Sequence, residues 1–281
     1  MIPPANHPPR SRTTPAADRH YFDFHDIELA RQVERLLFPR SSPVCTWCCI
    51  GVKNRMAGIL GGDYFDFITM PDGCQTLFLG DVTGHGLHAS VVMSLLYGFI
   101  HHATLGSCDP LRLVDEVNTF LLRFARRAQG LDQFFSSTLF FGIIDPQTLT
   151  MRYVNAGQVP GLVLRNGQVM ELATTAWPLG YFDSPQIGSA IFRFEPGDRL
   201  LLYTDGITEA PNGAGERFGT ERLKTLLVED GADHMEFLER LFAALHRFGT
   251  SDPPEDDCTA IVADIRGGFI PNGTGGGTEG T

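Results

Sequence analysis

The sequence lacks any long apolar run, and no stretch approaches the roughly 20 residues that a membrane-spanning helix needs. Residues 1–14 are rich in proline and lack the apolar core of a signal peptide. The chain also lacks an excess of positive charge, because 33 Asp and Glu residues outnumber 22 Lys and Arg residues and the net charge is −11. This balance excludes a general nucleic-acid binder and a binder of anionic membranes. We therefore predict a cytoplasmic protein.

The six cysteines do not form a complete metal-binding pattern. Cys45 and Cys48 have the spacing of half a zinc site, but no second pair of Cys or His with such spacing follows. Residues 44–53 alternate in hydropathy and are predicted to form a strand, where a cysteine behaves as a small buried hydrophobe. Core packing is the preferred interpretation, with zinc binding as the alternative.

The composition is that of a soluble globular protein, with 43% hydrophobic and 20% charged residues among 281. We predict a disordered segment at residues 1–22 and a flexible tail, rich in Gly and Thr, at residues 267–281. A linker-type helix is predicted within residues 23–40, capped by Asp26 and ending before Pro39. Residues 41–266 then form one domain.

The order of the predicted elements in this domain indicates its fold class. Helices are predicted at residues 87–102, 111–127, 220–228 and 233–248. Asp109 and Pro110 are expected to be the cap and the first residue of the second of these helices. Strands are predicted within residues 44–81 and at residues 136–144, 150–155, 161–164, 169–172, 190–194, 199–204 and 258–265. Because helices and strands do not alternate as in βαβ units, we predict an α+β fold of antiparallel sheets with helices outside.

Four aspartates each adjoin a predicted strand. Asp63 and Asp256 precede apolar strands, whereas Asp81 and Asp205 follow them. Antiparallel neighbours would bring these strand starts and ends to one edge of a sheet. Carboxylates crowded there repel one another unless a cation lies between them, and Mg²⁺ or Mn²⁺ prefers such oxygen ligands. An ordinary turn is the alternative for each segment, since glycines adjoin Asp63 and Asp205.

Eight segments together carry a resemblance to a known family. They are residues 27–39, 62–66, 80–86, 155–157, 178–180, 203–210, 218–219 and 256–259. In this order and register they resemble the metal-dependent Ser/Thr protein phosphatases of the PPM class, in the bacterial branch typified by SpoIIE and RsbU. The resemblance implies a four-layer α-β-β-α sandwich of two antiparallel sheets flanked by helices, in agreement with the element order.

The resemblance also implies two divalent metal ions, Mn²⁺ or Mg²⁺, and the residues that hold them. Asp81 would bridge both ions. Asp205 and Asp256 would complete one site, and the backbone carbonyl of Val82 would join the other. Asp63 would act directly or through metal-bound water.

Three further residues, Asp257, Asp66 and His85, lie close in sequence to these predicted ligands. Asp257 competes with Asp256, and we prefer Asp256 because the family's ligand corresponds to the first residue of the pair. Asp66 lies on the opposite face of its strand from Asp63, so we predict a structural or supporting role for it. His85 is a candidate for substrate binding or for protonating the leaving group, with local support of the metal loop as the alternative.

Two metal ions can neutralise a phosphate monoester and activate water, so the resemblance implies a phosphoserine/phosphothreonine protein phosphatase. The implied substrate is a STAS-type anti-sigma-factor antagonist in a partner-switching pathway. One alternative is a catalytically inactive scaffold that binds such a phosphoprotein, and another is a two-metal enzyme acting on nucleotides. The nucleotide enzyme is not favoured, because the sequence contains no Gly-rich phosphate-binding loop at the start of a helix. The apolar stripe within residues 26–38 would either mediate a homodimer or pack on its own domain.

Overall fold

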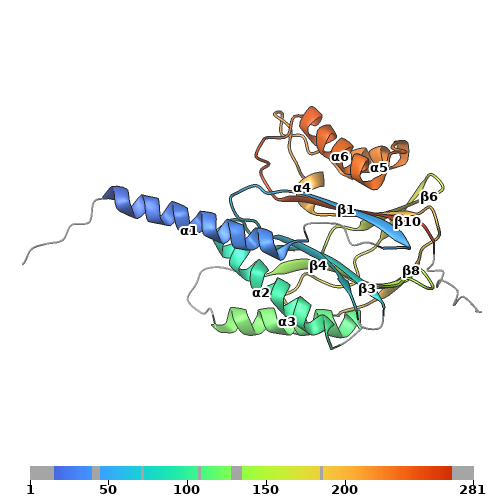
Figure 1. The fold of residues 1–281 in the computed structure, drawn as a ribbon, viewed down its shortest axis with the longest axis horizontal. Coiled ribbons are helices and arrows are strands. Elements are labelled where there is room, and N and C mark those ends of the chain that lie inside the picture. The colour runs from blue at the N-terminus through green and yellow to red at the C-terminus, as the bar shows by residue number, and fades with distance from the viewer. Residues whose placement is uncertain are drawn as a thin grey trace, which may run out of the picture.

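The computed structural model describes residues 16–39, 45–70, 73–106, 109–127, 135–183 and 186–267. Two five-stranded sheets stack between two layers of helices (Figure 1). Neighbouring strands in both sheets pair antiparallel. The predicted α+β sandwich with α-β-β-α layers is therefore confirmed.

The last strand that the structure describes lies inside the first sheet, not at its edge. The order across this sheet is β1 (Cys48–Arg55), β10 (Cys258–Ile265), β9 (Arg199–Tyr203), β6 (Gly161–Arg165) and β7 (Gln168–Leu172). The order across the second sheet is β2 (Asp63–Thr69), β3 (Gln75–Val82), β4 (Ser137–Asp145), β5 (Thr150–Ala156) and β8 (Ala190–Arg193). β10 thus joins the N-terminal strand β1 to the C-terminal half of the domain.

Helices cover the outer faces of both sheets (Figure 1). α2 (Leu87–Thr104) and α3 (Pro110–Arg127) cover the second sheet, and α5 (Thr220–Glu229) and α6 (His234–Phe248) cover the first. α4 (Asp205–Thr208) is a single turn directly after β9. α3 begins at Pro110 as predicted, and the Asp109 side chain accepts the N–H of Leu111 at 3.1 Å.

α1 (Ala16–Leu37) contacts α2 and projects from the body of the domain (Figure 1). It begins at Ala16, so the prediction that Asp26 caps it is wrong, and residues 16–22 are helical rather than disordered. The reason is that residues 16–37 contain neither Pro nor Gly, so nothing interrupts the helix on the N-terminal side of Asp26. The remainder of the predicted disordered segment and nearly all of the predicted tail lie outside the described residues.

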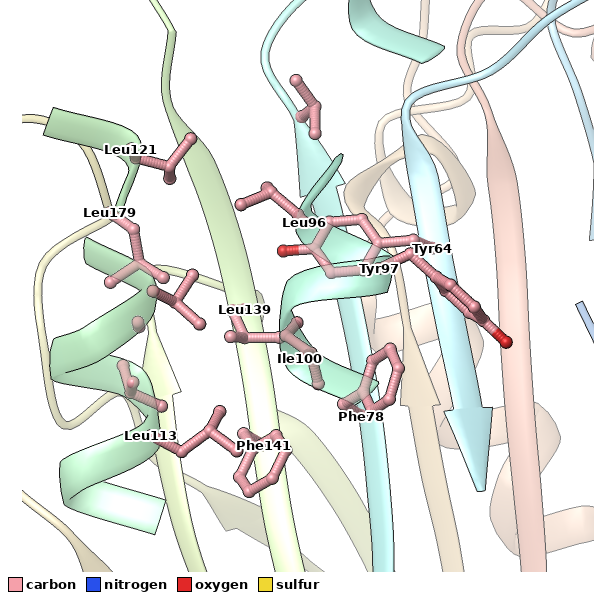
Figure 2. Close-up of a cluster of buried hydrophobic side chains, with 14 of the residues drawn as sticks. Tyr64, Phe78, Leu96, Tyr97, Ile100, Leu113, Leu121, Leu139, Phe141 and Leu179 are labelled. Atoms are coloured by element: carbon pink, nitrogen blue, oxygen red, sulfur yellow. The ribbon is translucent and has the colours of Figure 1, made fainter. Parts of the chain in front are cut away.

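Alternation along β2 and β3 sends side chains into two separate cores. Phe65 and Leu79 face the first sheet and pack in a cluster with Ile261. Tyr64 and Phe78 face the opposite way, into the cluster beneath α2 and α3 that Figure 2 shows. A third cluster fills the space between the first sheet and the helices α5 and α6. These three apolar layers hold the sandwich together.

Cys48 is 1% exposed and packs between the two sheets. This burial confirms the interpretation that it acts as a small core hydrophobe, although β1 begins at Cys48 rather than at residue 44. Among the helices that the structure describes, none is long and apolar enough to cross a bilayer.

Candidate metal centre

The four predicted aspartates come together from both sheets. Asp63 opens β2 and stands opposite Asp81, near the end of β3. Asp205 follows β9 and Asp256 lies just before β10, the neighbour of β9. Burial raises the pKa of Asp81 to about 8, and the charges of Asp205 and Asp256 add to this rise. The two pairs therefore interact across the end of the sandwich.

Asp63 is the most deeply buried of the four, with 1% of its surface exposed. Its Oδ2 accepts hydrogen bonds from the hydroxyls of Thr204 at 3.0 Å and Thr259 at 2.5 Å. Its Oδ1 is buried and has no hydrogen-bond partner among the described residues. Burial, with the charges of Asp81 and Asp257, raises the pKa of Asp63 well above its ordinary value. A cation beside Oδ1 would satisfy that oxygen and favour the charged carboxylate.

Gly62 lets the end of β3 approach the start of β2. A Cβ atom at this position would lie 2.8 Å from the Val82 carbonyl oxygen and 3.1 Å from Asp81 Oδ1. The N–H of Val82 donates to the Gly62 carbonyl at 3.2 Å and fixes this approach. Glycine is therefore required where two of the predicted ligands, Asp81 and the Val82 carbonyl, lie side by side.

Asp257 holds the loop that leads into β2. Its Oδ1 accepts the N–H of Ala57 at 2.8 Å, and its Oδ2 accepts the N–H of Gly62 at 2.7 Å. Asp256 is exposed, and its Oδ1 accepts the neighbouring N–H of Asp257 at 2.9 Å. Because both oxygens of Asp257 are committed to backbone groups, this arrangement supports the preference for Asp256 as the ligand.

Amide substitutions should separate the roles of these two neighbours. Asp257→Asn presents an NH₂ group to a backbone donor and should lower the free energy of unfolding by about 1–3 kcal/mol. Asp256→Asn should change it by less than about 0.5 kcal/mol, because the side chain is exposed, but should raise the Mn²⁺ concentration needed for activity. Urea unfolding in EDTA measures the first effect, and Mn²⁺ titration measures the second. Equal stability losses in the two variants would contradict this division.

The residues present fit a hard divalent cation bound in part through water. Within the ranges that the structure describes, no three His, Cys, Asp or Glu side chains meet as in a closed metal cluster. Mg²⁺ suits a more open arrangement, because it keeps several waters and takes only one or two carboxylates. The unpartnered Asp63 Oδ1 and the mutual repulsion of the carboxylates both favour such an ion.

A cavity of about 390 Å³ opens beside Asp256, and its lining includes Glu209 and Arg217. Arg217 Nη1 lies 2.8 Å from Glu209 Oε1, so the guanidinium is paired with a carboxylate within the cavity wall. His85 is exposed and lies near Asp256. Partial burial of the Asp256 carboxyl raises its pKa, and a positive charge on His85 opposes that rise. The structure thus brings His85 to the centre, while its role stays a prediction.

Asp66 points away from the centre, as its place on the opposite face of β2 requires. Its Oδ2 lies 2.8 Å from His101 Nε2 and within hydrogen-bond reach of the Tyr97 hydroxyl. That hydroxyl also contacts the backbone carbonyl of Leu37 at the end of α1. Asp66 therefore has a structural role, linking β2, α2 and α1.

The structure gives roles to Thr204, Thr259 and Glu34 that the sequence does not predict. Thr204 directly precedes the predicted ligand Asp205, and Thr259 lies three residues after the predicted ligand Asp256. This closeness to a predicted ligand at a strand end is the one sequence signal that could have identified them. Glu34 lies on α1, is 2% exposed and accepts the N–H of Gly61 through Oε1 at 3.1 Å. No local pattern marks Glu34, because its partner lies in a loop beyond the helix.

The Glu34 carboxyl should make stability depend on pH. Burial raises its pKa to about 7 from an ordinary 4.5; the Gly61 N–H opposes this rise and the charge of Asp257 adds to it. A carboxyl whose pKa is higher in the folded state destabilises the fold as the pH rises through that interval. Glu34→Gln, which is neutral at every pH, should therefore match the wild type at pH 4 and below, where the carboxyl is protonated in the folded and the unfolded state alike. At pH 8 it should be more stable by about 1–3 kcal/mol.

Thermal unfolding in EDTA between pH 4 and pH 8 measures this difference. Glu28→Gln is the matched control, because Glu28 lies on the same helix and is only half-buried. A stability difference for Glu34→Gln that does not grow with pH would contradict the prediction.

Comparison with known proteins agrees with this architecture. The family model described as Stage II sporulation protein E (SpoIIE) matches residues 71–266. Protein IcfG of Synechocystis sp. is 24% identical over 259 residues, which cover 84% of this chain and 41% of IcfG. Phosphoserine phosphatase RsbP of Bacillus subtilis is 22% identical over 245 residues, which cover 86% of this chain and 58% of RsbP. The chain thus spans about half the length of these relatives.

A solved structure shares the fold over almost the whole described chain. The SiaA-PP2C domain of Pseudomonas aeruginosa aligns with a TM-score of 0.73 at 21% identity. The alignment covers 91% of this chain and 99% of that domain. The two sheets and their flanking helices are therefore those of the PP2C fold.

Proposed function

This chain belongs to the SpoIIE family, and on that basis we propose that it is a protein-serine/threonine phosphatase that uses two divalent ions, Mn²⁺ or Mg²⁺. The observation that carries the proposal is the buried, unpartnered Oδ1 of Asp63 opposite Asp81. It lies where burial, together with the charges of neighbouring carboxylates, raises the pKa values of Asp63 and Asp81, which is the electrostatic setting of a cation site.

The proposed ligands are the five groups at this end of the sandwich. Asp81 would hold both ions, Asp205 and Asp256 would complete one site, and the Val82 carbonyl would join the other, with Asp63 acting directly or through water. When bound, the two ions neutralise the phosphate and lower the pKa of a bound water so that it can attack phosphorus.

The remaining residues of the centre position these ligands. Thr204 and Thr259 donate to Asp63 Oδ2, which leaves Oδ1 as the oxygen available to a cation. Asp257 fixes the N–H of Gly62, and so holds the loop against the end of β3. We propose that His85, which is exposed beside Asp256, contacts the phosphate or the leaving hydroxyl of the substrate.

The reaction requires no side-chain nucleophile. Burial raises the pKa of the Cys258 thiol to about 12, and the charges of Asp63 and Asp256 add to this rise, so the reactive thiolate is disfavoured. Cys258→Ser should therefore change the rate by less than about threefold, because the thiol takes no part in the reaction. Acid-quench trapping with ³²P-labelled substrate should leave the protein unlabelled. A radiolabelled enzyme formed at a competent rate would overturn direct attack by water.

The proposed substrate is a phosphoprotein, specifically a STAS-type anti-sigma-factor antagonist in a partner-switching pathway. The name of the relative RsbP, a phosphoserine phosphatase, supports this substrate class. The test is purified protein with Mn²⁺, assayed on 4-nitrophenyl phosphate and on a panel of phosphorylated STAS proteins. Release of phosphate from neither, together with retained binding of a phosphorylated STAS protein, would favour the inactive scaffold instead.

A homodimer through α1 is also part of the proposal. Leu29, Val33 and Leu36 are 46%, 61% and 63% exposed, and their spacing places them on one face of the helix. The adjoining flank of the helix contributes Glu34 and Leu37 to contacts within the domain. The exposed face supports pairing with a second copy, and sedimentation of the wild-type protein tests it.

A further inference from the structure

Three aromatic side chains lie exposed and in contact on the loop between β7 and β8. Trp177, Tyr181 and Phe182, here called the aromatic cluster, are 63%, 48% and 49% exposed. The ring centroid of Phe182 lies 6.1 Å from that of Trp177 and 6.3 Å from that of Tyr181. Contiguous exposed aromatic surface marks interaction sites, and Trp and Tyr dominate their binding energy.

The backbone that carries the aromatic cluster is firmly anchored. Leu179 is buried beneath α2 and α3 (Figure 2), and it exchanges two backbone hydrogen bonds with Ser137, at 3.1 and 2.8 Å. Asn118 of α3 accepts the N–H of Gly180 at 2.9 Å and donates to the Phe182 carbonyl at 3.1 Å. The aromatic cluster is thus held ready for a partner, so that binding needs little further ordering of the loop.

The same anchor fixes the aromatic cluster next to the metal centre. Ser137 pairs with Val82 across β4 and β3, and its hydroxyl donates to the Asp81 carbonyl at 2.8 Å. Leu179, one strand spacing beyond Ser137, is therefore about 10 Å from the end of β3. An extended peptide covers that distance in about three or four residues.

The charged groups at the margin of the aromatic cluster are paired with each other. Arg126, at the end of α3, forms an ion pair with Asp183, which directly follows the aromatic cluster. Recognition at this place therefore depends on apolar and aromatic contact rather than on an unpaired charge of either group.

We infer that the aromatic cluster binds an apolar side chain of the phosphoprotein substrate, about three or four residues from the phosphorylated residue. The inference rests on the proposed phosphatase function. It commits to the substrate as the occupant, because the loop is anchored through Ser137 to the strand end that carries Asp81, within reach of the residues that flank a phosphorylated residue at the centre. The aromatic cluster then selects among phosphoproteins, while the metal centre provides the chemistry common to all of them.

The test uses two phosphoserine peptides of equal length and charge with Mn²⁺-loaded enzyme. One carries Phe three and four residues on either side of the phosphoserine, and the other carries Asn at those positions. For the wild type, kcat/KM should be at least about tenfold higher with the Phe peptide than with the Asn peptide, because the Phe peptide has the lower KM. Trp177→Ala and Phe182→Ala should each remove most of this preference and leave the rate on 4-nitrophenyl phosphate unchanged. Ile191→Ala, which alters a side chain that is 67% exposed on β8, should keep the preference.

The outcomes separate the inference from the function on which it rests. If 4-nitrophenyl phosphate and both peptides resist hydrolysis, the proposed phosphatase function fails. If the peptides are hydrolysed equally by the wild type, or if the preference survives in both aromatic variants, the docking role of the aromatic cluster is wrong. A change from dimer to monomer in Trp177→Ala, measured by sedimentation, would also overturn it, since a second copy would then be the occupant.

Discussion

Asp81→Asn is expected to lower the rate of 4-nitrophenyl phosphate hydrolysis at least about a hundredfold at saturating Mn²⁺, and Asp205→Asn should do the same. A neutral amide is a weaker ligand for a hard cation than a carboxylate, so the bound ion is held less well and activates water less. Both variants should still fold. In the metal-free protein burial raises the pKa of Asp81, and the charge of Asp205 adds to that rise, so losing either carboxylate relieves repulsion.

Steady-state rates over a range of Mn²⁺ concentrations measure this effect, and circular dichroism checks the fold. Asp115→Asn is the matched control, because Asp115 is an exposed aspartate on α3 and should tolerate the same substitution without loss of rate. Near-native turnover of either Asp81→Asn or Asp205→Asn at saturating Mn²⁺ would show that the ligands are assigned wrongly.

Removing metal is expected to abolish hydrolysis while leaving the fold intact. The three apolar clusters that hold the layers together do not include the acidic side chains, so the far-ultraviolet spectrum should be unchanged in EDTA. Adding Mn²⁺ at about 100 times its dissociation constant should restore activity and stabilise the protein by about 2.7 kcal/mol for each site filled, because the ions bind the folded state.

This experiment needs metal-free dialysis before the assay, since tightly held ions can survive brief chelation. Thermal unfolding with and without Mn²⁺ provides a readout that does not depend on catalysis. Full hydrolysis in excess EDTA after such dialysis would exclude the metal-dependent mechanism.

Much of the fold could be predicted from apolar periodicity alone. The alternation of Tyr64 and Phe65 in β2 places one ring under α2 and the other between the sheets, and both lie there. The start of α1 could not be predicted in this way. Asp26 has the chemistry of a cap, but a helix continues through such a residue when no Pro or Gly interrupts the segment before it.

The candidate site was predictable where it depends on neighbouring strands. Asp63 and Asp81 lie on the adjacent strands β2 and β3, so strand order alone brings them together. Asp205 and Asp256 depend on the pairing of β9 with β10, which strand-end positions suggest but do not determine. The contact of Thr204 with Asp63 spans 141 residues of sequence, and that of Asp257 with Gly62 spans 195. Such hydrogen bonds follow from the packing of the two sheets and leave no periodic signal.

The place of β10 in the first sheet determines when the centre can exist during synthesis. β10 lies between β1 and β9, and the residues just before it supply Asp256 and the Asp257 carboxylate that holds the loop at Gly62. The ribosome makes this strand after every other strand that the structure describes. Until it emerges, β1 and β9 lack their shared neighbour and the loop before Asp63 has no anchor. A nascent chain that stops before residue 256 therefore has no complete centre, and the proposed hydrolysis would require β10 to be in place.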